Sequence, residues 1–178
     1  TDTWSQLADG PGAMVGHRLV YDSESDRLIM FGGITYPDFA FVGETWVYDY
    51  NTNTWTSMQP LNPPAARNFH GMVYDSKADR TVLWGDYLPS DKVVWTYDYN
   101  TNVWEELSYA YGPRIRDYSS LSYDEKADRI ILFGGYKIGN KGVGVDETWA
   151  YNLNTNTWQK MHPAINPGKI YGFAITYA

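Results

Sequence analysis

ETWVYDYNTNTW, residues Glu44 to Trp55, has two further copies in this chain of 178 residues: VWTYDYNTNVW from Val94 to Trp104 and ETWAYNLNTNTW from Glu147 to Trp158. Each copy holds two tryptophans nine positions apart. Alternating aromatic residues favour a strand, and the Asn51-Thr52 pair and its equivalents favour a tight turn, because asparagine tolerates a left-handed backbone. Each copy therefore predicts a β-hairpin whose two tryptophans lie close together across the strand pair.

A second stretch repeats with the same period. VYDSESDRLIMFGG at residues 20–33 returns as VYDSKADRTVLWGD at 73–86 and as SYDEKADRIILFGG at 122–135. A partial copy of the hairpin, TDTW, opens the chain and ends in Trp4. The second tryptophans of the copies, Trp4, Trp55, Trp104 and Trp158, are 51, 49 and 54 residues apart. The chain is therefore built from a repeat of about 50 residues.

Each repeat predicts four short strands. The first is the apolar run before the glycine pair, the second and third are the arms of the tryptophan hairpin, and the fourth is the stretch before Tyr-Asp. The fourth strands are expected at residues 17–21, 70–74, 119–123 and 173–177. No segment of ten or more residues has the 3.6-residue apolar period of a helix, so the fold is predicted to be all-β. Four antiparallel strands in such a repeat are typical of a propeller blade.

The repeated residues resemble the kelch motif. Gly32-Gly33 and Gly134-Gly135 follow an apolar strand, and Glu-Thr-Trp, Tyr-Asp and Asn-x-x-x-Trp come next in order. The resemblance implies a kelch-type β-propeller of about three and a half four-stranded antiparallel blades over residues 1–178. We expect a half-blade at 1–22 and blades at 23–75, 76–124 and 125–178. The middle copy departs from the motif at Trp84 and Asp86, and the Arg-x-x-His element is complete only in Arg67 and His70.

The motif residues have structural roles in this interpretation. We expect the tryptophans to fill the wedges between neighbouring blades. We expect the Asp-x-x-x-Asp-Arg loops, such as Asp22 to Arg27, to connect the outer strand of one blade to the inner strand of the next. Such a loop could instead bind calcium, but it lacks the ligand density and the placed glycine of calcium loops.

The number of repeats is too small for a ring to close without help, because closed propellers have about 4–8 blades. Three explanations remain open: the sequence belongs to a longer propeller, another copy or chain supplies the missing blades, or the arc is capped at its ends. We favour the first, with self-association second.

Composition restricts the partners. The formal net charge is -7 and no run of lysines and arginines offsets it, so neither nucleic acid nor insertion into a membrane is expected. The chain has no cysteine, which removes disulfides and thiolate metal sites, and we expect no cofactor and no metal. Its richness in Asn, Thr, Tyr and Trp slightly favours an extracellular or cell-surface protein over a cytoplasmic one.

The long loops are the candidate binding surface, because connections that vary between repeats lie on one face of a blade array. The candidate binding residues are aromatic and basic: Tyr36, Phe39, Arg67, His70, Tyr87, Tyr109, Tyr111, Arg114, Arg116, Tyr136, Lys137 and Lys141. Tyrosine and arginine are enriched in protein contacts, and exposed rings also suit sugars. The competing interpretation is that several of these rings only anchor their own loops.

The functional prediction is a non-catalytic protein-binding or scaffold module. The alternative is a carbohydrate-binding module, and a remnant of a propeller enzyme is the third candidate. The copper radical oxidases that share this propeller type use a cysteine-linked tyrosine, and this chain has no cysteine. No Ser/His/Asp order, phosphate loop or zinc spacing is present either.

Overall fold

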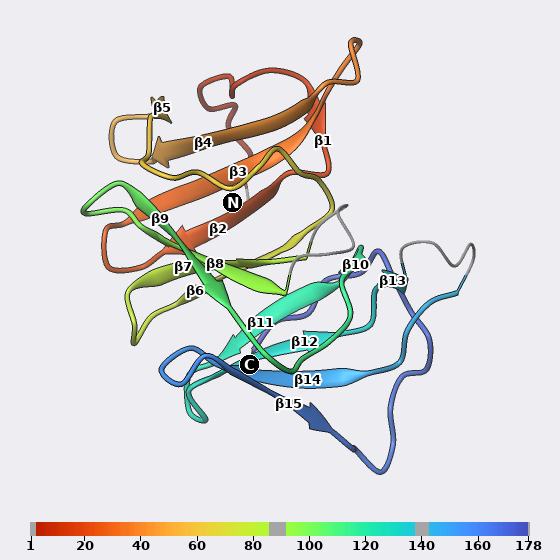
Figure 1. Ribbon diagram of the computed structural model, residues 1–178. Coiled ribbons are helices and arrows are strands. Elements are labelled where there is room, and N and C mark those ends of the chain that lie inside the picture. The colour runs from red at the N-terminus through yellow and green to blue at the C-terminus, as the bar shows by residue number, and fades with distance from the viewer. Residues whose placement is uncertain (1–2, 86–91, 138–142, 178) are drawn as a thin grey trace.

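The computed structural model describes residues 3–85, 92–137 and 143–177, which form strands, turns and loops (Figure 1). The prediction of an all-β fold is confirmed. Two of the candidate binding residues, Tyr87 and Lys141, lie outside the described residues. No helix long and apolar enough to cross a membrane occurs within the described part of the chain.

Three antiparallel sheets follow one another along the chain. The first contains β1 (Met14–Val15), β2 (Arg18–Asp22), β3 (Arg27–Thr35), β4 (Phe41–Asp49) and β5 (Thr54–Met58). The second contains β6 (Gly71–Asp75), β7 (Arg80–Trp84), β8 (Val93–Asp98) and β9 (Val103–Ser108). The third contains β11 (Ser120–Asp124), β12 (Arg129–Phe133), β14 (Thr148–Asn152) and β15 (Thr157–Met161). A short pair, β10 (Arg116–Asp117) with β13 (Tyr136–Lys137), forms a separate sheet, whereas β1 at the equivalent place in the first repeat pairs with the end of β3.

The order of strands within each sheet differs from the prediction. The strand that ends in Tyr21-Asp22, and its equivalents β6 and β11, is the first strand of its sheet, not the fourth. This follows because β2 pairs with β3, β6 with β7 and β11 with β12. The Asp22 to Arg27 loop is thus a hairpin turn inside one sheet. Asp22 Oδ1 accepts the amides of Glu24 and Ser25 at 3.0 and 3.1 Å, and Asp26 has a left-handed φ of 57°. These bonds close a tight turn and leave no room for a crossover between sheets.

The tryptophan hairpins form as predicted, with two differences in detail. The left-handed residue of each turn is the second asparagine, with φ of 53° at Asn53, 55° at Asn102 and 50° at Asn156. The partner directly opposite the second tryptophan is a tyrosine, since Tyr48 pairs with Trp55 and their rings are 5.0 Å apart. The position of the turn sets this register.

The first strands of the three sheets lie side by side, β2 next to β6 and β6 next to β11, while the later strands fan outward (Figure 1). Residues 173–177 form no strand, although one was expected there. They lie beside β11, where the amide of Ile175 donates to Ser120 Oγ at 3.1 Å. The first strands and this terminal segment therefore surround a common central space.

Two apolar cores lie between the sheets, and a tryptophan enters each of them. Trp104 of β9 is fully buried against Phe31 of β3, at 5.1 Å between ring centres, and its Nε1 donates to Thr45 Oγ1 at 3.0 Å. Trp158 of β15 packs on Trp84 of β7 in the same manner, at 5.5 Å. Trp104 and Trp158 thus fill the wedges between neighbouring sheets, as the sequence predicts, whereas Trp4 is fully exposed.

The connections divide between two faces. Short turns share one face, which we call the short-turn face, because Asn51 of one turn donates to Asp26 of the other at 2.9 Å, and the later repeats have the same bond. Long connections share the opposite face, the long-loop face, where the amide of Arg67 donates to the Val42 carbonyl at 3.2 Å. The long-loop face is the one that the sequence predicts to carry the binding surface.

Candidate functional site

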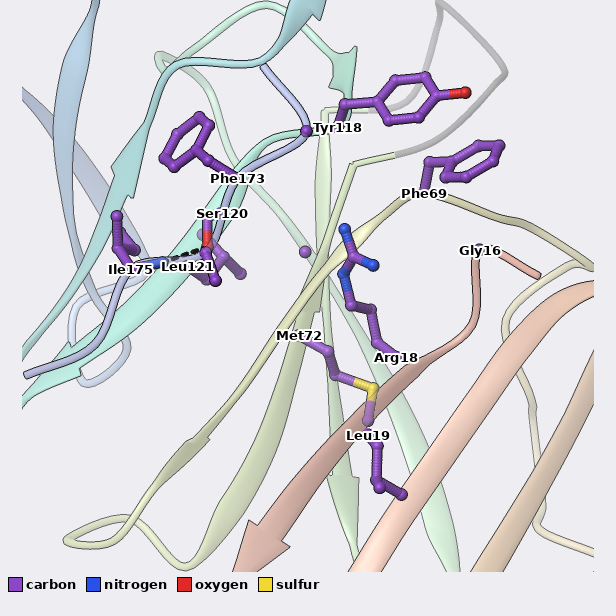
Figure 2. Close-up of a pocket in the computed structure, with 13 residues that line it drawn as sticks. Gly16, Arg18, Leu19, Phe69, Met72, Tyr118, Ser120, Leu121, Phe173 and Ile175 are labelled. Atoms are coloured by element: carbon purple, nitrogen blue, oxygen red, sulfur yellow. Dashed lines mark hydrogen bonds between the residues drawn. The ribbon is translucent and has the colours of Figure 1, made fainter. Parts of the chain in front are cut away.

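A cavity of about 540 Å³ opens at the long-loop end of the central space. Its walls come from the first strands and from the residues just before them. The lining residues are Gly16, Arg18, Leu19, Phe69, Gly71, Met72, Tyr118, Ser120, Leu121 and residues 172–175. We call this cavity the central mouth (Figure 2). Concave sites at which several repeated units converge are common places for ligand binding.

A chain of backbone hydrogen bonds runs around the central mouth. The amide of Phe69 donates to the carbonyl of Gly16 at 2.8 Å, Tyr118 to Phe69 at 3.0 Å, and Gly172 to Tyr118 at 3.0 Å. All of these residues have a left-handed backbone, with φ of 73°, 51°, 53° and 68° in chain order. Each bond joins equivalent positions of successive repeats, so the rim is tied from one sheet to the next.

Aromatic rings cover one side of the rim. Phe69 and Tyr118 stack at 4.1 Å with an interplanar angle of 22°. Tyr171 meets the ring of Tyr118 at 6.3 Å and that of Tyr136 at 5.5 Å. The two stacked rings are half-buried and Tyr171 is exposed, so the mouth offers apolar contact next to solvent.

Arg18 brings a positive charge into the central mouth. Figure 2 shows its guanidinium pointing from β2 toward the rim that carries Phe69 and Tyr118. The side chain is half-buried, and Nη1 donates to the carbonyl of His17 over a long 3.4 Å. No carboxylate of the described residues lies within ion-pair distance of Arg18, whereas Arg27, Arg80 and Arg116 each have one.

The environment of Arg18 is unfavourable for an unpaired cation. Burial lowers the pKa of the Arg18 guanidinium, and the histidines next to it bring no negative charge. The equivalent positions in the other repeats are Gly71, Ser120 and Ala174, which leave the rest of the mouth open. A partly desolvated cation beside open space favours a negatively charged ligand.

The comparison with protein families matches residues 1–177 to the KLHDC2/KLHL20/DRC7 kelch-repeats domain. The chain belongs to the kelch-repeat family. Its three large sheets, each built on four successive antiparallel strands, are accordingly propeller blades, and kelch-repeat domains commonly mediate protein binding. Among characterised proteins, Mei4-dependent protein 6 of Schizosaccharomyces pombe (strain 972 / ATCC 24843) is 27% identical over 81 residues. That similarity covers 43% of this chain and 11% of the yeast protein, so the chain spans only a small part of this relative.

The two kelch arginines predicted to lie on the loop face are buried, and their roles are structural. Arg67 is 3% exposed and donates to the Gly85 carbonyl at 3.3 Å. Arg116 is fully buried and donates to the Gly134 carbonyl at 3.2 Å and to Glu147 at 2.8 Å. Each arginine thus ties its own connection to the glycine strand of the following blade, where it satisfies buried carbonyl groups.

Glu147 forms ion pairs with two cations, Arg116 and Lys160. Lys160 donates to its other oxygen at 2.8 Å, and Trp149 Nε1 donates at 3.2 Å. Burial would raise the pKa of Glu147, but the hydrogen bonds from Lys160, Arg116 and Trp149 outweigh it and hold the pKa at about 2. The carboxylate is therefore a fixed anion of the third blade.

His70 and Tyr109 are also buried, contrary to their predicted place on the loop face. His70 is fully enclosed next to Phe31, and burial and the charge of Arg67 lower its pKa well below the usual value. Tyr109 is 5% exposed, and its hydroxyl accepts from Trp84 Nε1 at 3.1 Å. The sequence around these two residues does not indicate that their connections are buried between two blades.

The remaining described candidates stand in or next to long connections, and they do not form one cluster. Tyr36 and Phe39 are exposed and meet edge to face at 5.7 Å at the tip of the loop between β3 and β4. Tyr111 is exposed beside Trp149, and Arg114 is exposed close to it in sequence. Tyr136 is half-buried next to Tyr171, and the Lys137 backbone pairs with Arg116 in the β10–β13 ladder.

Arg18, Phe69 and Tyr118, which line the central mouth, and Tyr171 beside Tyr118 are absent from the residues predicted from the sequence. A signal for Arg18 is present in the repeat, because a charged residue stands where the other copies have glycine, serine and alanine. Phe69 and Tyr118 immediately precede the buried positions of His70 and Ser119, and only their left-handed backbone turns them toward the mouth.

Three acidic residues meet on the short-turn face. Carboxylate oxygens of Asp22, Glu24 and Asp79 all lie within 4.8 Å of one another. Asp22 Oδ1 already accepts two turn amides, and Asp79 Oδ1 accepts the Tyr74 hydroxyl at 2.7 Å. These bonds account for both aspartates as turn-stabilising residues.

Proposed function

We propose that this kelch domain is a protein-binding module whose central mouth holds an extended peptide segment, with an acidic group of the peptide next to Arg18. The observation that supports this proposal most directly is the half-buried guanidinium of Arg18, which has no carboxylate within ion-pair distance among the described residues. A carboxylate from a partner would supply the missing charge-assisted hydrogen bond. Phe69 and Tyr118 would contact apolar side chains on either side of it.

The size and shape of the mouth also favour a peptide. A volume of about 540 Å³ accommodates a few residues of extended chain, not a folded domain. The exposed rings of Tyr36 and Phe39 on the same face would add contacts farther from the mouth. In this proposal the domain is non-catalytic, and its loops act only in recognition.

Carbohydrate binding is a weaker candidate. Sugars commonly stack on a flat, open ring, but Phe69 and Tyr118 stack on each other, and Tyr36 meets Phe39 edge to face. A neutral sugar would also leave the charge of Arg18 without a partner.

The test is to pan a phage-displayed peptide library on the 178-residue domain and to measure binding of the enriched peptides by fluorescence anisotropy. We expect enrichment of peptides with Asp or Glu among apolar residues. The Arg18→Glu variant should lose about tenfold or more in affinity, because a charge-assisted bond contributes about 1.5–3 kcal/mol.

Arg114→Glu is the matched control, because it makes the same change of charge at an exposed position outside the central mouth. Its affinity should stay within about threefold of the parent, consistent with the small effect of exposed charges. Enrichment of peptides without acidic residues, or equal losses in both variants, would argue against the proposal. Binding to a glycan array without binding to any peptide would favour the carbohydrate alternative.

A further inference from the structure

The interface between the first two blades contains a socket for an indole ring. Trp104 of the second blade enters it, and Thr45 Oγ1 of the first blade accepts its Nε1 at 3.0 Å. Ile29, Phe31 and Met58 of the first blade belong to the same apolar cluster. The socket therefore combines apolar walls with one hydroxyl acceptor, which is what an indole requires when it is buried.

The outer flank of the third blade repeats this socket. Ile131, Thr148 and Met161 occupy the repeat positions of Ile29, Thr45 and Met58. These three residues line a cavity of about 430 Å³ together with Pro163 and Ile165. No described tryptophan enters it, so the third blade presents the receptor half of an interface that occurs twice inside the molecule.

The connection after the third blade also has an unused backbone edge. In the first interface, the Leu61 amide donates to the Asn102 carbonyl at 3.1 Å, and the Trp104 amide donates to the Leu61 carbonyl at 3.0 Å. Ala164 is the repeat equivalent of Leu61, six residues after Trp158 as Leu61 is after Trp55. Within the described residues no backbone bond of Ala164 is present, and the neighbouring Ile165 is 89% exposed.

The complementary half of the interface is at the start of the chain. Trp4 is the repeat equivalent of Trp104 and Trp158, yet it is fully exposed, whereas those two are 0% and 5% exposed. The segment that follows is held on the first blade, because the Ala8 amide donates to Asn53 Oδ1 at 2.8 Å and Gly10 lies against the ring of Trp55. The Trp4 indole is thus exposed to solvent, while the segment after it is attached to the first blade.

We propose that the flank of the third blade binds Trp4 of a second copy of this chain. In this contact the indole fills the cavity of Ile131, Thr148 and Met161, and its Nε1 donates to Thr148 Oγ1. The Trp4 amide donates to the Ala164 carbonyl, as Trp104 does to Leu61. The contact joins different surfaces of the two copies, so it is a head-to-tail association. It uses neither the central mouth nor Arg18 and does not depend on the peptide-binding proposal.

The test uses the 178-residue chain, two variants and sedimentation equilibrium. The average mass of the parent should rise above 20.4 kDa with concentration in the micromolar to millimolar range, as expected for a small interface. Trp4→Ala removes the indole, and Met161→Glu places a charge in the socket. Each variant alone should remain at 20.4 kDa with unchanged circular dichroism, because Trp4 is fully exposed and Met161 is 39% exposed.

The decisive sample is an equimolar mixture of the two variants. The Met161→Glu copy keeps its Trp4 and the Trp4→Ala copy keeps its socket, so one junction forms and assembly stops at two copies. Tyr50→Ala is the control, since Tyr50 is an aromatic residue on the short-turn face that is 69% exposed, and its loss should leave the parent's assembly unchanged.

Three results would each overturn the proposal. The parent chain could stay at 20.4 kDa at every concentration. The Trp4→Ala variant could assemble like the parent, which would assign the flank to another occupant. The mixture of variants could remain monomeric while the parent assembles.

Discussion

The two interfaces between blades differ in one hydrogen bond, and this difference can be tested by exchanging the residues. Trp104 Nε1 donates to Thr45 Oγ1 at 3.0 Å, with Trp104 fully buried and Thr45 only 1% exposed. In the second interface, Val94 occupies the position of Thr45, and the buried Nε1 of Trp158 has no partner among the described residues. The substitutions Thr45→Val and Val94→Thr should therefore change stability in opposite directions.

The magnitudes follow from the burial of the groups. Thr45→Val keeps the shape of the side chain but leaves the indole N–H of Trp104 without an acceptor, at a cost of about 1–3 kcal/mol. Val94→Thr supplies an acceptor for Trp158, and the gain of about 0.5–1.5 kcal/mol is reduced by the desolvation of the new hydroxyl. We expect a net stabilisation of up to about 1 kcal/mol for Val94→Thr.

Urea unfolding followed by circular dichroism measures both changes. Thr56→Val is the matched control, because Thr56 is exposed on β5, and its replacement should change stability by less than about 0.5 kcal/mol. A double-mutant cycle isolates the bond: in a Trp104→Phe background, which has no indole N–H, Thr45→Val should cost nothing further. Equal losses for Thr45→Val and Thr56→Val, or no coupling with Trp104→Phe, would refute the reasoning.

Three further predictions concern the fold. The pKa of Glu147 is about 2 in the folded protein and 4.5 in its ordinary state, so its stabilising contribution is complete above pH 4.5 and is lost as the pH falls toward 2. In Glu147→Gln, the unfolding free energy measured in acid titrations should therefore depend less on pH over this range. Gly32→Ala should abolish folding as judged by circular dichroism, because the new Cβ would lie 2.5 Å from the Arg67 carbonyl oxygen. The control Gly168→Ala, at a similar φ but with open space around it, should lower the free energy of unfolding by only about 1–2 kcal/mol. Trp104→Ala should cost about 3–5 kcal/mol in urea unfolding, and Trp55→Ala clearly less, because Trp55 is half-exposed; equal losses would contradict the wedge assignment.

The repeat and its hairpins could be predicted from sequence because they depend on local signals. The spacing of the tryptophans and the Asn-Thr-Asn turns fixes which strands form. The pairing between strands depends on which neighbour an apolar strand meets, and two neighbours are compatible with the pattern. The pattern therefore predicts that the loop from Asp22 to Arg27 connects two blades, whereas its aspartate bonds make it a hairpin turn.

The candidate site was harder to predict for a related reason. Arg67 and Arg116 stand in long polar connections, yet both are enclosed and donate to backbone carbonyls of the next blade. Arg18 stands inside a strand that reads as apolar, yet its side chain lies at the central mouth. Only the arrangement of the blades around an axis decides which of these arginines is enclosed and which lines an open cavity.

The three hydrogen bonds that join Gly16, Phe69, Tyr118 and Gly172 use main-chain atoms alone, so the frame that they form does not depend on the side chains of Phe69 and Tyr118. Phe69 and Tyr118 have a left-handed backbone that bulky residues adopt at a cost, and replacement by asparagine or glycine at either position should relieve that cost. The residues at these two positions can thus be substituted with little loss of stability. Randomising both positions in a library is a direct route to new binding specificities.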